Sequence, residues 1–178
     1  RITGQLQALH TTEGVQIIGF SGVAPRQNTT ALMSMLGFII ADEIDIAAAL
    51  SRGNLRLTQG QGAERAQPQA PAKQNVTLLD ASMHSPGLQR IFATELGRGL
   101  ANILAQQVQV ADATRYFLRN RLRLITAGVR GVDDLNWSEF PFLLNELKRD
   151  NRFVFIDLPP VLQHPETAHL HRFLDGIV

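Results

Sequence analysis

Residues that could bind a phosphate group follow the first apolar segment of the chain. Residues 15–20 (VQIIGF) predict a buried strand, residues 21–30 (SGVAPRQNTT) a loop, and the segment from Ala31 onward a helix. Strand, loop and helix in this order are the setting of the pattern GxxxxGK[ST], in which backbone N–H groups and a lysine hold phosphates. Here Asn28 and Thr29 stand in place of the glycine and the lysine. The sequence therefore predicts a phosphate loop that lacks its lysine.

The candidate phosphate-contacting residues of this loop are mostly neutral. Thr29 is uncharged and too short to replace a lysine, and a lost charge-assisted contact is worth about 1.5–3 kcal/mol. Arg26 could supply positive charge instead, and that alternative stays open. If the glycine positions need a positive φ, Asn28 suits such a backbone better than Arg26 does. The candidate loop comprises Pro25, Arg26, Gln27, Asn28, Thr29 and Thr30.

Two acidic residues end two other apolar segments. Asp80 closes the segment VTLLD, and Asp157 closes the segment RFVFID. Because the carboxyl ends of parallel strands share one edge of a sheet, Ser21, Asp80 and Asp157 should converge on one site. Thr30 and Asp157 are the candidate ligands of Mg²⁺, and Asp80 and Asp157 are the residual catalytic candidates. The alternative that both acids only brace the strand ends stays open.

Apolar segments alternate with helical ones along the chain, which predicts an α/β fold. The expected strands are residues 15–20, 76–80, 122–128, 152–157 and 176–178, and the expected helices lie within 2–9, 31–50, 87–98, 99–106, 138–149 and 167–174. Continuous apolar strands that alternate with helices favour a mainly parallel sheet covered on both faces, a three-layer αβα domain. We expect residues 1–178 to form a single domain that is truncated at both ends. Residues 52–75, rich in Gln, Gly, Ala and Pro, should form a flexible insertion.

Two helices carry more detailed expectations about which residues face the core. In the helix 31–50, apolar residues at helical spacing should form the buried face: Leu32, Met35, Leu36, Ile39 and Ile40. In the helix 138–149, Ser138 is the expected N-cap, and three residues should face the core: Phe142, Leu143 and Leu147.

The composition excludes several classes of function. The formal net charge is +1, so no strong field favours nucleic acid or an anionic membrane. The chain has no cysteine, which removes disulfides, thiolate nucleophiles and cysteine metal sites. No apolar run reaches the ~18 residues that a membrane-spanning helix needs.

Histidines and arginines each form a cluster outside the loop. His164, His169 and His171 lack a carboxylate or cysteine at ligand spacing, so no metal site is expected there. Four arginines surround the single tyrosine, Tyr116. These arginines are interpreted as a solvated face, with a contact for an acidic partner as the alternative.

Three segments in this order and spacing resemble the bacterial tyrosine kinases of capsule and exopolysaccharide synthesis, which are P-loop ATPases related to the MinD/ParA group. Residues 21–30 are similar to their Walker A region. Residues 77–86 (TLLDASMHSP) are similar to their Walker A′ segment, and residues 155–161 (FIDLPPV) are similar to their Walker B segment. The resemblance covers nearly the whole chain except residues 52–75.

The resemblance implies a function for the chain, and the departures from the family pattern modify it. Active relatives bind ATP and Mg²⁺, but this chain lacks the lysine and has Ser82 at the second acid of Walker A′. We therefore expect no cofactor, with ATP and Mg²⁺ as the open alternative. The interpretation is a pseudo-kinase, a catalytically degenerate regulatory or binding module in bacterial capsule or exopolysaccharide synthesis and export.

The resemblance also implies a location and partners. The expected partner is a polysaccharide co-polymerase or synthase component at the inner membrane. The chain itself would be cytoplasmic and peripheral to that membrane, through its partner or a missing fused segment. Homo- or hetero-oligomers fit this interpretation, and nucleic acid does not. Two alternatives stay open: an active ATPase or tyrosine kinase with a non-standard P-loop, and a MinD/ParA-like positioning ATPase.

Overall fold

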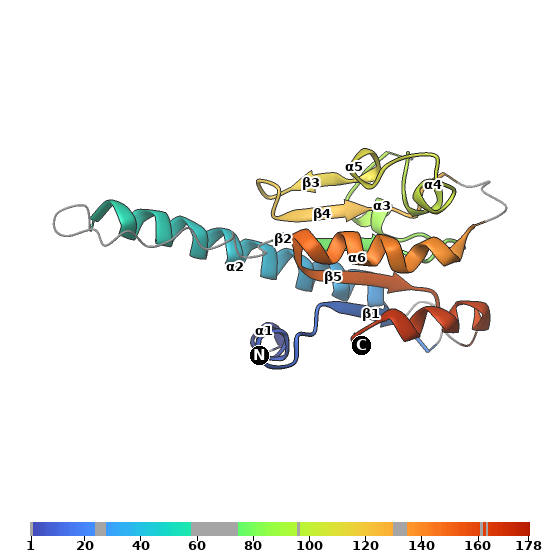
Figure 1. Ribbon diagram of the computed structural model, residues 1–178, viewed down its shortest axis with the longest axis horizontal. Coiled ribbons are helices and arrows are strands. Elements are labelled where there is room, and N and C mark those ends of the chain that lie inside the picture. The colour runs from blue at the N-terminus through green and yellow to red at the C-terminus, as the bar shows by residue number, and fades with distance from the viewer. Residues whose placement is uncertain are drawn as a thin grey trace.

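A mainly parallel sheet forms the centre of the molecule (Figure 1). The computed structural model describes residues 2–23, 28–57, 75–95, 97–129, 135–160, 162 and 164–178. Among these residues, six strands lie in the order β3-β4-β2-β5-β1-β6. They are β1 (Ile17–Ser21), β2 (Asn75–Asp80), β3 (Arg115–Phe117), β4 (Leu122–Ile125), β5 (Asn151–Leu158) and β6 (Gly176–Ile177). Neighbouring strands are parallel except for β3 and β4, which are antiparallel.

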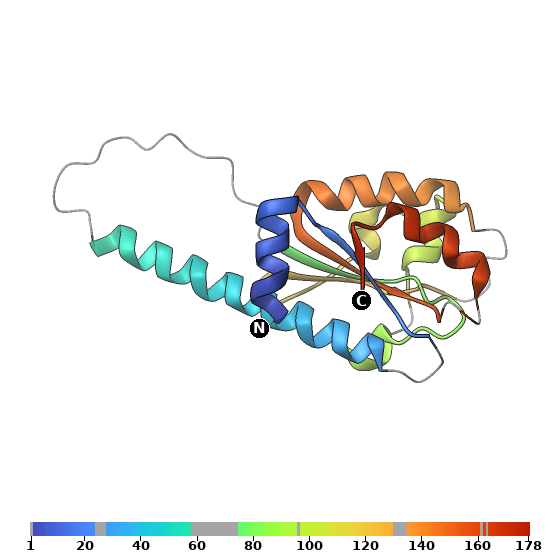
Figure 2. The same ribbon diagram turned by 90° about the horizontal axis from the view of Figure 1, so that it is seen from below.

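Helices cover both faces of the sheet (Figures 1 and 2). They are α1 (Ile2–Glu13), α2 (Thr29–Leu57), α3 (Leu88–Ile91), α4 (Leu100–Leu104), α5 (Val110–Ala113) and α6 (Phe140–Asp150), with 3₁₀ segments η1 (Trp137–Glu139) and η2 (Pro165–Phe173). Side chains alternate along each strand, so Leu78 and Phe155 pack with α2 while Leu79 and Ile156 pack with α6. The three-layer αβα fold expected from the sequence is confirmed.

The third predicted strand, residues 122–128, ends earlier than expected because its last residues contact α4. The carbonyl oxygen of Thr126 accepts a hydrogen bond from the Leu100 N–H at 2.8 Å, and that of Ala127 accepts one from the Ala101 N–H at 2.9 Å. These carbonyls satisfy the free N–H groups at the start of α4 instead of continuing the sheet. The short edge strand β3 was not predicted.

The predicted core face of α2 is partly wrong. Leu36 and Ile40 are buried as expected, but Leu32, Met35 and Ile39 are exposed. The buried residues are Met33, Leu36, Ile40, Ala41 and Ile44.

Two residues that an apolar pattern overlooks fix the rotation of α2. Thr30 contacts Asp157 of β5, and Gly37 faces Leu78 so closely that a Cβ there would lie 2.6 Å from Leu78 Cδ2. Both contacts turn the side of α2 that carries Met33 toward the sheet.

The predicted start of the helix 138–149 is also wrong. Ser138 does not cap α6, because a 3₁₀ turn precedes the helix and Asn136 Oδ1 accepts hydrogen bonds from the Ser138 N–H and Oγ. Phe142 is 68% exposed rather than buried. Leu143 and Leu147 are buried as expected. The buried face also includes Phe140 and Leu144, and these four positions have the i, i+3, i+4, i+7 spacing of one helix face.

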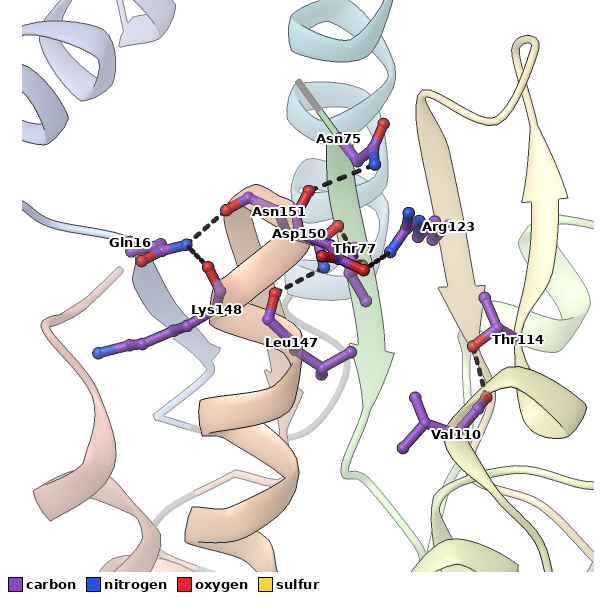
Figure 3. A network of polar contacts seen from close by, with 10 residues as sticks. All are labelled: Gln16, Asn75, Thr77, Val110, Thr114, Arg123, Leu147, Lys148, Asp150 and Asn151. Atoms are coloured by element: carbon purple, nitrogen blue, oxygen red, sulfur yellow. Dashed lines mark hydrogen bonds and ion pairs between the residues drawn. The ribbon is translucent and has the colours of Figure 1, made fainter. Parts of the chain in front are cut away.

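Buried amides close the C-terminal end of α6 (Figure 3). The last carbonyls of a helix have no partner inside it. Here the Asn151 Nδ2 donates to the Leu147 carbonyl and the Gln16 Nε2 to the Lys148 carbonyl, both at 2.8 Å. The Thr77 hydroxyl donates to Asn151 Oδ1 at 2.8 Å. The network fixes α6 to the amino ends of β1, β2 and β5, the strands whose opposite ends carry the candidate site.

The first residues of the expected insertion at 52–75 belong to α2. The helix extends to Leu57 rather than to residue 50, and β2 begins at Asn75. Of the expected insertion at residues 52–75, residues 58–74 lie outside the described residues.

Candidate functional site

The two candidate acids lie side by side at the carboxyl edge of the sheet. Asp80 is the register partner of Asp157 across the parallel pair β2 and β5. Ser21, at the end of β1, pairs with Leu158, and its hydroxyl donates to the Pro159 carbonyl at 3.0 Å. The three strand ends therefore meet at one edge. Both carboxyl groups are buried, with Asp80 0% and Asp157 2% exposed.

Thr30 joins the start of α2 to Asp157. The Thr30 hydroxyl donates a hydrogen bond to Asp157 Oδ2 at 2.7 Å. Burial raises the pKa of Asp157 to about 7, although the Thr30 hydrogen bond lowers it, and the charge of Asp80 raises it further. A hydroxyl and a carboxylate in contact are the oxygen ligands that Mg²⁺ takes in phosphate sites.

The side chain of Asp80 accepts hydrogen bonds from the backbone of the turn that follows β2. Its Oδ2 accepts hydrogen bonds from the N–H groups of Gly87 at 3.0 Å and Leu88 at 3.1 Å, and its Oδ1 accepts one from the Ser82 N–H at 3.0 Å. Burial raises the pKa of Asp80 to about 6, while these hydrogen bonds and the charge of Arg90 lower it. Both oxygens already have partners, so Asp80 braces the turn before α3 and is a poor candidate for binding metal or activating water.

Gly87 lets this turn approach the start of α2. A Cβ at Gly87 would lie 2.8 Å from Thr30 Cγ2, a distance at which one of the two groups must move. Asp80 holds Gly87, Gly87 packs against Thr30, and Thr30 donates to Asp157. One continuous set of contacts thus links the ends of β2 and β5 to α2.

The loop residues that the structure describes carry no cation. Asn28 has a φ of +48°, the left-handed conformation for which Asn is better suited than most residues, and its carbonyl accepts from the Leu32 N–H at 3.0 Å. Thr29 is the first residue of α2. Pro25, Arg26 and Gln27 lie outside the described residues, so the proposal that Arg26 replaces the lysine rests on the sequence alone.

The described residues keep two oxygen groups that could serve a metal ion, but not the lysine that a phosphate chain needs. Thr30 and Asp157 would hold Mg²⁺, which polarises a phosphoryl oxygen when it is bound. The phosphates need backbone N–H groups and a cation as well. The N–H groups at the start of α2 remain, but Thr29 stands where a lysine would be expected.

Sequence reasoning missed one contact at the rim of this edge. The rings of His84 and His164 stack with centroids 4.2 Å apart and planes inclined by 17°. The two histidines come from the loops that follow β2 and β5, and no motif signals their contact. No group of three potential ligands for a metal ion occurs among the residues that the structure describes.

Two of the four clustered arginines, Arg115 and Arg123, contact other residues at the edge of the sheet. Arg115 donates to the Glu95 carbonyl at 3.1 Å, and Arg123 lies 3.7 Å from the Asp150 carboxylate. The guanidinium of Arg123 also lies 5.9 Å from the ring centroid of Tyr116. Tyr116, which is 49% exposed, thus contacts a side chain of the neighbouring strand β4.

Comparisons with solved structures define the class of fold. The VpsO kinase domain is similar, with a TM-score of 0.72 and 18% identity over 98% of this chain and 73% of that one. The kinase domain of the Escherichia coli tyrosine kinase ETK has a TM-score of 0.69 and 19% identity over 99% of this chain and 58% of that one. The BceF tyrosine kinase domain has a TM-score of 0.68 and 22% identity, with 99% and 61% coverage.

An ATPase of the MinD group has the same architecture at a lower similarity. The Pyrococcus horikoshii protein MinD, solved with Mg-ADP, has a TM-score of 0.56 and 15% identity over 81% of this chain and 49% of that one. No family model matches the sequence, and no curated protein matches it. The fold is thus that of the P-loop ATPases. The solved structures that are similar to this chain are bacterial tyrosine kinase domains and MinD/ParA-type ATPases, as the sequence resemblance predicted.

None of the described helices is both long enough and apolar enough to cross a membrane.

Proposed function

We propose that this chain is a catalytically degenerate member of the bacterial tyrosine kinases, a pseudo-kinase that binds partners instead of transferring phosphate. One observation carries the proposal: the neutral Thr29 begins α2 directly before Thr30, whose hydroxyl contacts Asp157 at 2.7 Å. In a phosphate loop the metal-binding hydroxyl directly follows the lysine. Thr30 therefore takes the position of that hydroxyl, and Thr29 takes the position of the lysine.

The charge balance of the site supports the loss of nucleotide binding. A lysine contact with the β- and γ-phosphates is worth about 1.5–3 kcal/mol, or roughly 10- to 150-fold in affinity. Its contribution to a phosphoryl-transfer transition state is larger. The site keeps two buried acids, Asp80 and Asp157, while the neutral Thr29 takes the place of the lysine. When these acids are ionised, they repel a triphosphate.

The proposed role is that of a regulatory or binding module in bacterial capsule or exopolysaccharide synthesis. The family resemblance, and the likeness in fold to tyrosine kinase domains over 98–99% of the chain, support this proposal. The partner would be a polysaccharide co-polymerase or synthase component. The chain would act on the cytoplasmic side of the inner membrane, and self-assembly is compatible with this role.

Calorimetric titration with Mg-ATP and Mg-ADP tests the proposal. The wild type should show no binding at nucleotide concentrations up to about 1 mM. The double variant Asn28→Gly/Thr29→Lys should bind at least about tenfold more tightly, because it restores the glycine and the lysine. Adding Thr30→Val to that variant is the matched control, and it should weaken the Mg²⁺-dependent part of the binding. Micromolar affinity of the wild type with Mg²⁺-dependent turnover would refute the pseudo-kinase proposal.

A second candidate function is an active ATPase or tyrosine kinase with a non-standard P-loop. The observation in its favour is the contact between Thr30 and Asp157, which keeps the metal-binding pair together. Arg26 would then replace the lysine. This candidate predicts that Asp157→Asn abolishes turnover, and it fails if the wild type has no turnover. A MinD/ParA-like positioning role is the weaker alternative, because the kinase domains have the higher TM-scores, 0.72 against 0.56.

A further inference from the structure

A groove lies on the side of the sheet opposite to the Thr30–Asp157 contact. Its volume is about 370 Å³, within the range of sites that hold small ligands or a few side chains. It lies between α6 and the segment that contains α4 and α5, which cover the same face of the sheet (Figure 2). The lining residues that matter are Glu139, Phe142, Leu143 and Glu146 on one side and Val108 and Val110 on the other.

The α6 side of the groove combines an apolar floor with an exposed aromatic ring. Glu139, Phe142, Leu143 and Glu146 are spaced i, i+3, i+4 and i+7, which puts them along one side of the helical segment. Leu143 is buried at 4% exposure and forms the floor. Phe142 is 68% exposed, so a large apolar side chain stands at the groove with most of its surface in water.

The charge of the groove has one sign. Among the residues that the structure describes, its two charged lining residues, Glu139 and Glu146, are both acidic, and no lysine or arginine lines it. Within the described part of the chain, neither glutamate forms an ion pair. The groove therefore presents carboxylates next to apolar surface, and its complement is a chain segment with basic side chains next to apolar ones.

We propose that this groove binds a basic, amphipathic segment of a partner protein. Apolar side chains of the partner would cover Phe142 and reach Leu143, while lysine or arginine side chains would meet Glu139 and Glu146. A helix laid into a groove between helices is a common mode of such recognition. Rim charges mainly speed association and select the partner, whereas the aromatic side chain carries more of the affinity. The inference does not depend on whether the phosphate loop binds nucleotide.

Two synthetic peptides test the proposal. Both are helices of about 18 residues with the same leucine face, and they carry lysine or glutamate at the polar positions. Fluorescence anisotropy with the full chain should show binding of the lysine peptide only, weakening with salt. Phe142→Ser should lower the affinity at least about tenfold, and Glu139→Gln/Glu146→Gln should lower it about fivefold or more.

Matched controls separate the groove from non-specific attraction. Met35→Ser removes an apolar residue of 63% exposure on α2, and Glu13→Gln removes an exposed charge on α1. Neither should change the affinity. Thermal melting should show unchanged stability for Phe142→Ser, because its side chain is exposed. The proposal is overturned if both peptides bind equally well, or if the lysine peptide does not bind at about 1 mM. It is also overturned if the control variants weaken binding as much as the groove variants do. Ultracentrifugation that finds a dimer abolished by Phe142→Ser would overturn it too, because a second copy would then be the occupant.

Discussion

Replacing Asp157 by asparagine should stabilise the protein near pH 8 and change it little near pH 4. Burial raises the pKa of Asp157 from the ordinary 3.8 to about 7. A difference of about three pH units corresponds to about 4 kcal/mol between the charged and neutral forms. Asparagine has nearly the same shape, carries no charge, and can still accept the Thr30 hydrogen bond through its Oδ1. The variant should therefore be more stable than the wild type by up to about 4 kcal/mol near pH 8.

The direction of the pH dependence follows from the same pKa. Because the folded-state pKa lies above the unfolded one, the folded protein holds this proton more tightly. The resulting stabilisation is fully present below about pH 4 and is lost as the pH rises through about 7. The raised pKa of Asp80, about 6, acts in the same direction. Asp175 has a lowered pKa and acts in the opposite direction, but only at pH values below the ordinary 3.8.

Urea denaturation at several values between about pH 4 and about pH 8 measures these free energies of unfolding. Asp80→Asn is the matched comparison. Its amide oxygen can accept hydrogen bonds from the N–H groups of Gly87 and Leu88 or from that of Ser82, but not from all three. The increase in the free energy of unfolding near pH 8 should therefore be smaller than for Asp157→Asn by about 1–3 kcal/mol. Two outcomes would show that burial does not raise the pKa of Asp157: a variant Asp157→Asn that is less stable than the wild type near pH 8, or an equal loss of stability in both proteins as the pH rises.

Four further substitutions, in three predictions, test contacts around the site. Gly87→Ala should destabilise the protein by about 1–3 kcal/mol, because its Cβ would lie 2.8 Å from Thr30 Cγ2; urea denaturation that shows no change would refute this packing. Phe140→Ala should cost about 3–5 kcal/mol because Phe140 is fully buried, and Phe142→Ala should cost less than about 0.5 kcal/mol; equal losses in thermal melting would contradict the assigned faces of α6. Asn151→Ala should cost about 1–3 kcal/mol, because it leaves the buried Thr77 hydroxyl and the Leu147 carbonyl without that partner; hydrogen exchange in the last turn of α6 should rise with it, and unchanged exchange would count against the capping role.

The layers and most of the strands could be predicted because they depend on patterns that single residues do not disturb. Buried parallel strands are continuous apolar runs, and Asp80 and Asp157 end two of them. Their convergence then followed from the geometry of parallel sheets. The edge strand β3 had no such run, because its three residues, Arg115–Phe117, are only partly buried.

The rotation of α2 and α6 could not be predicted from apolar residues alone. Both helices carry more apolar residues than their buried faces can hold, so a periodic pattern fits more than one rotation. In α2 the choice depends on Thr30 and Gly37, which contact β5 and β2 respectively. In α6 it depends on Phe140, which lies inside the predicted helix 138–149 and is buried in place of Phe142. Tertiary contacts of a hydroxyl and of a glycine are invisible to a hydrophobic pattern.

The contacts of the site give a physical reason why its acids could remain without the lysine. A phosphate-loop lysine reaches toward the nucleotide, so replacing it by Thr29 costs the fold little. Asp80 and Thr30 differ, because one satisfies three backbone N–H groups and the other connects α2 to Asp157. Loss of either leaves buried polar groups without partners, at about 1–3 kcal/mol each. Their presence is therefore weak evidence for catalysis, and the nucleotide affinity of the Asn28→Gly/Thr29→Lys variant is the measurement that separates a preserved fold from a preserved function.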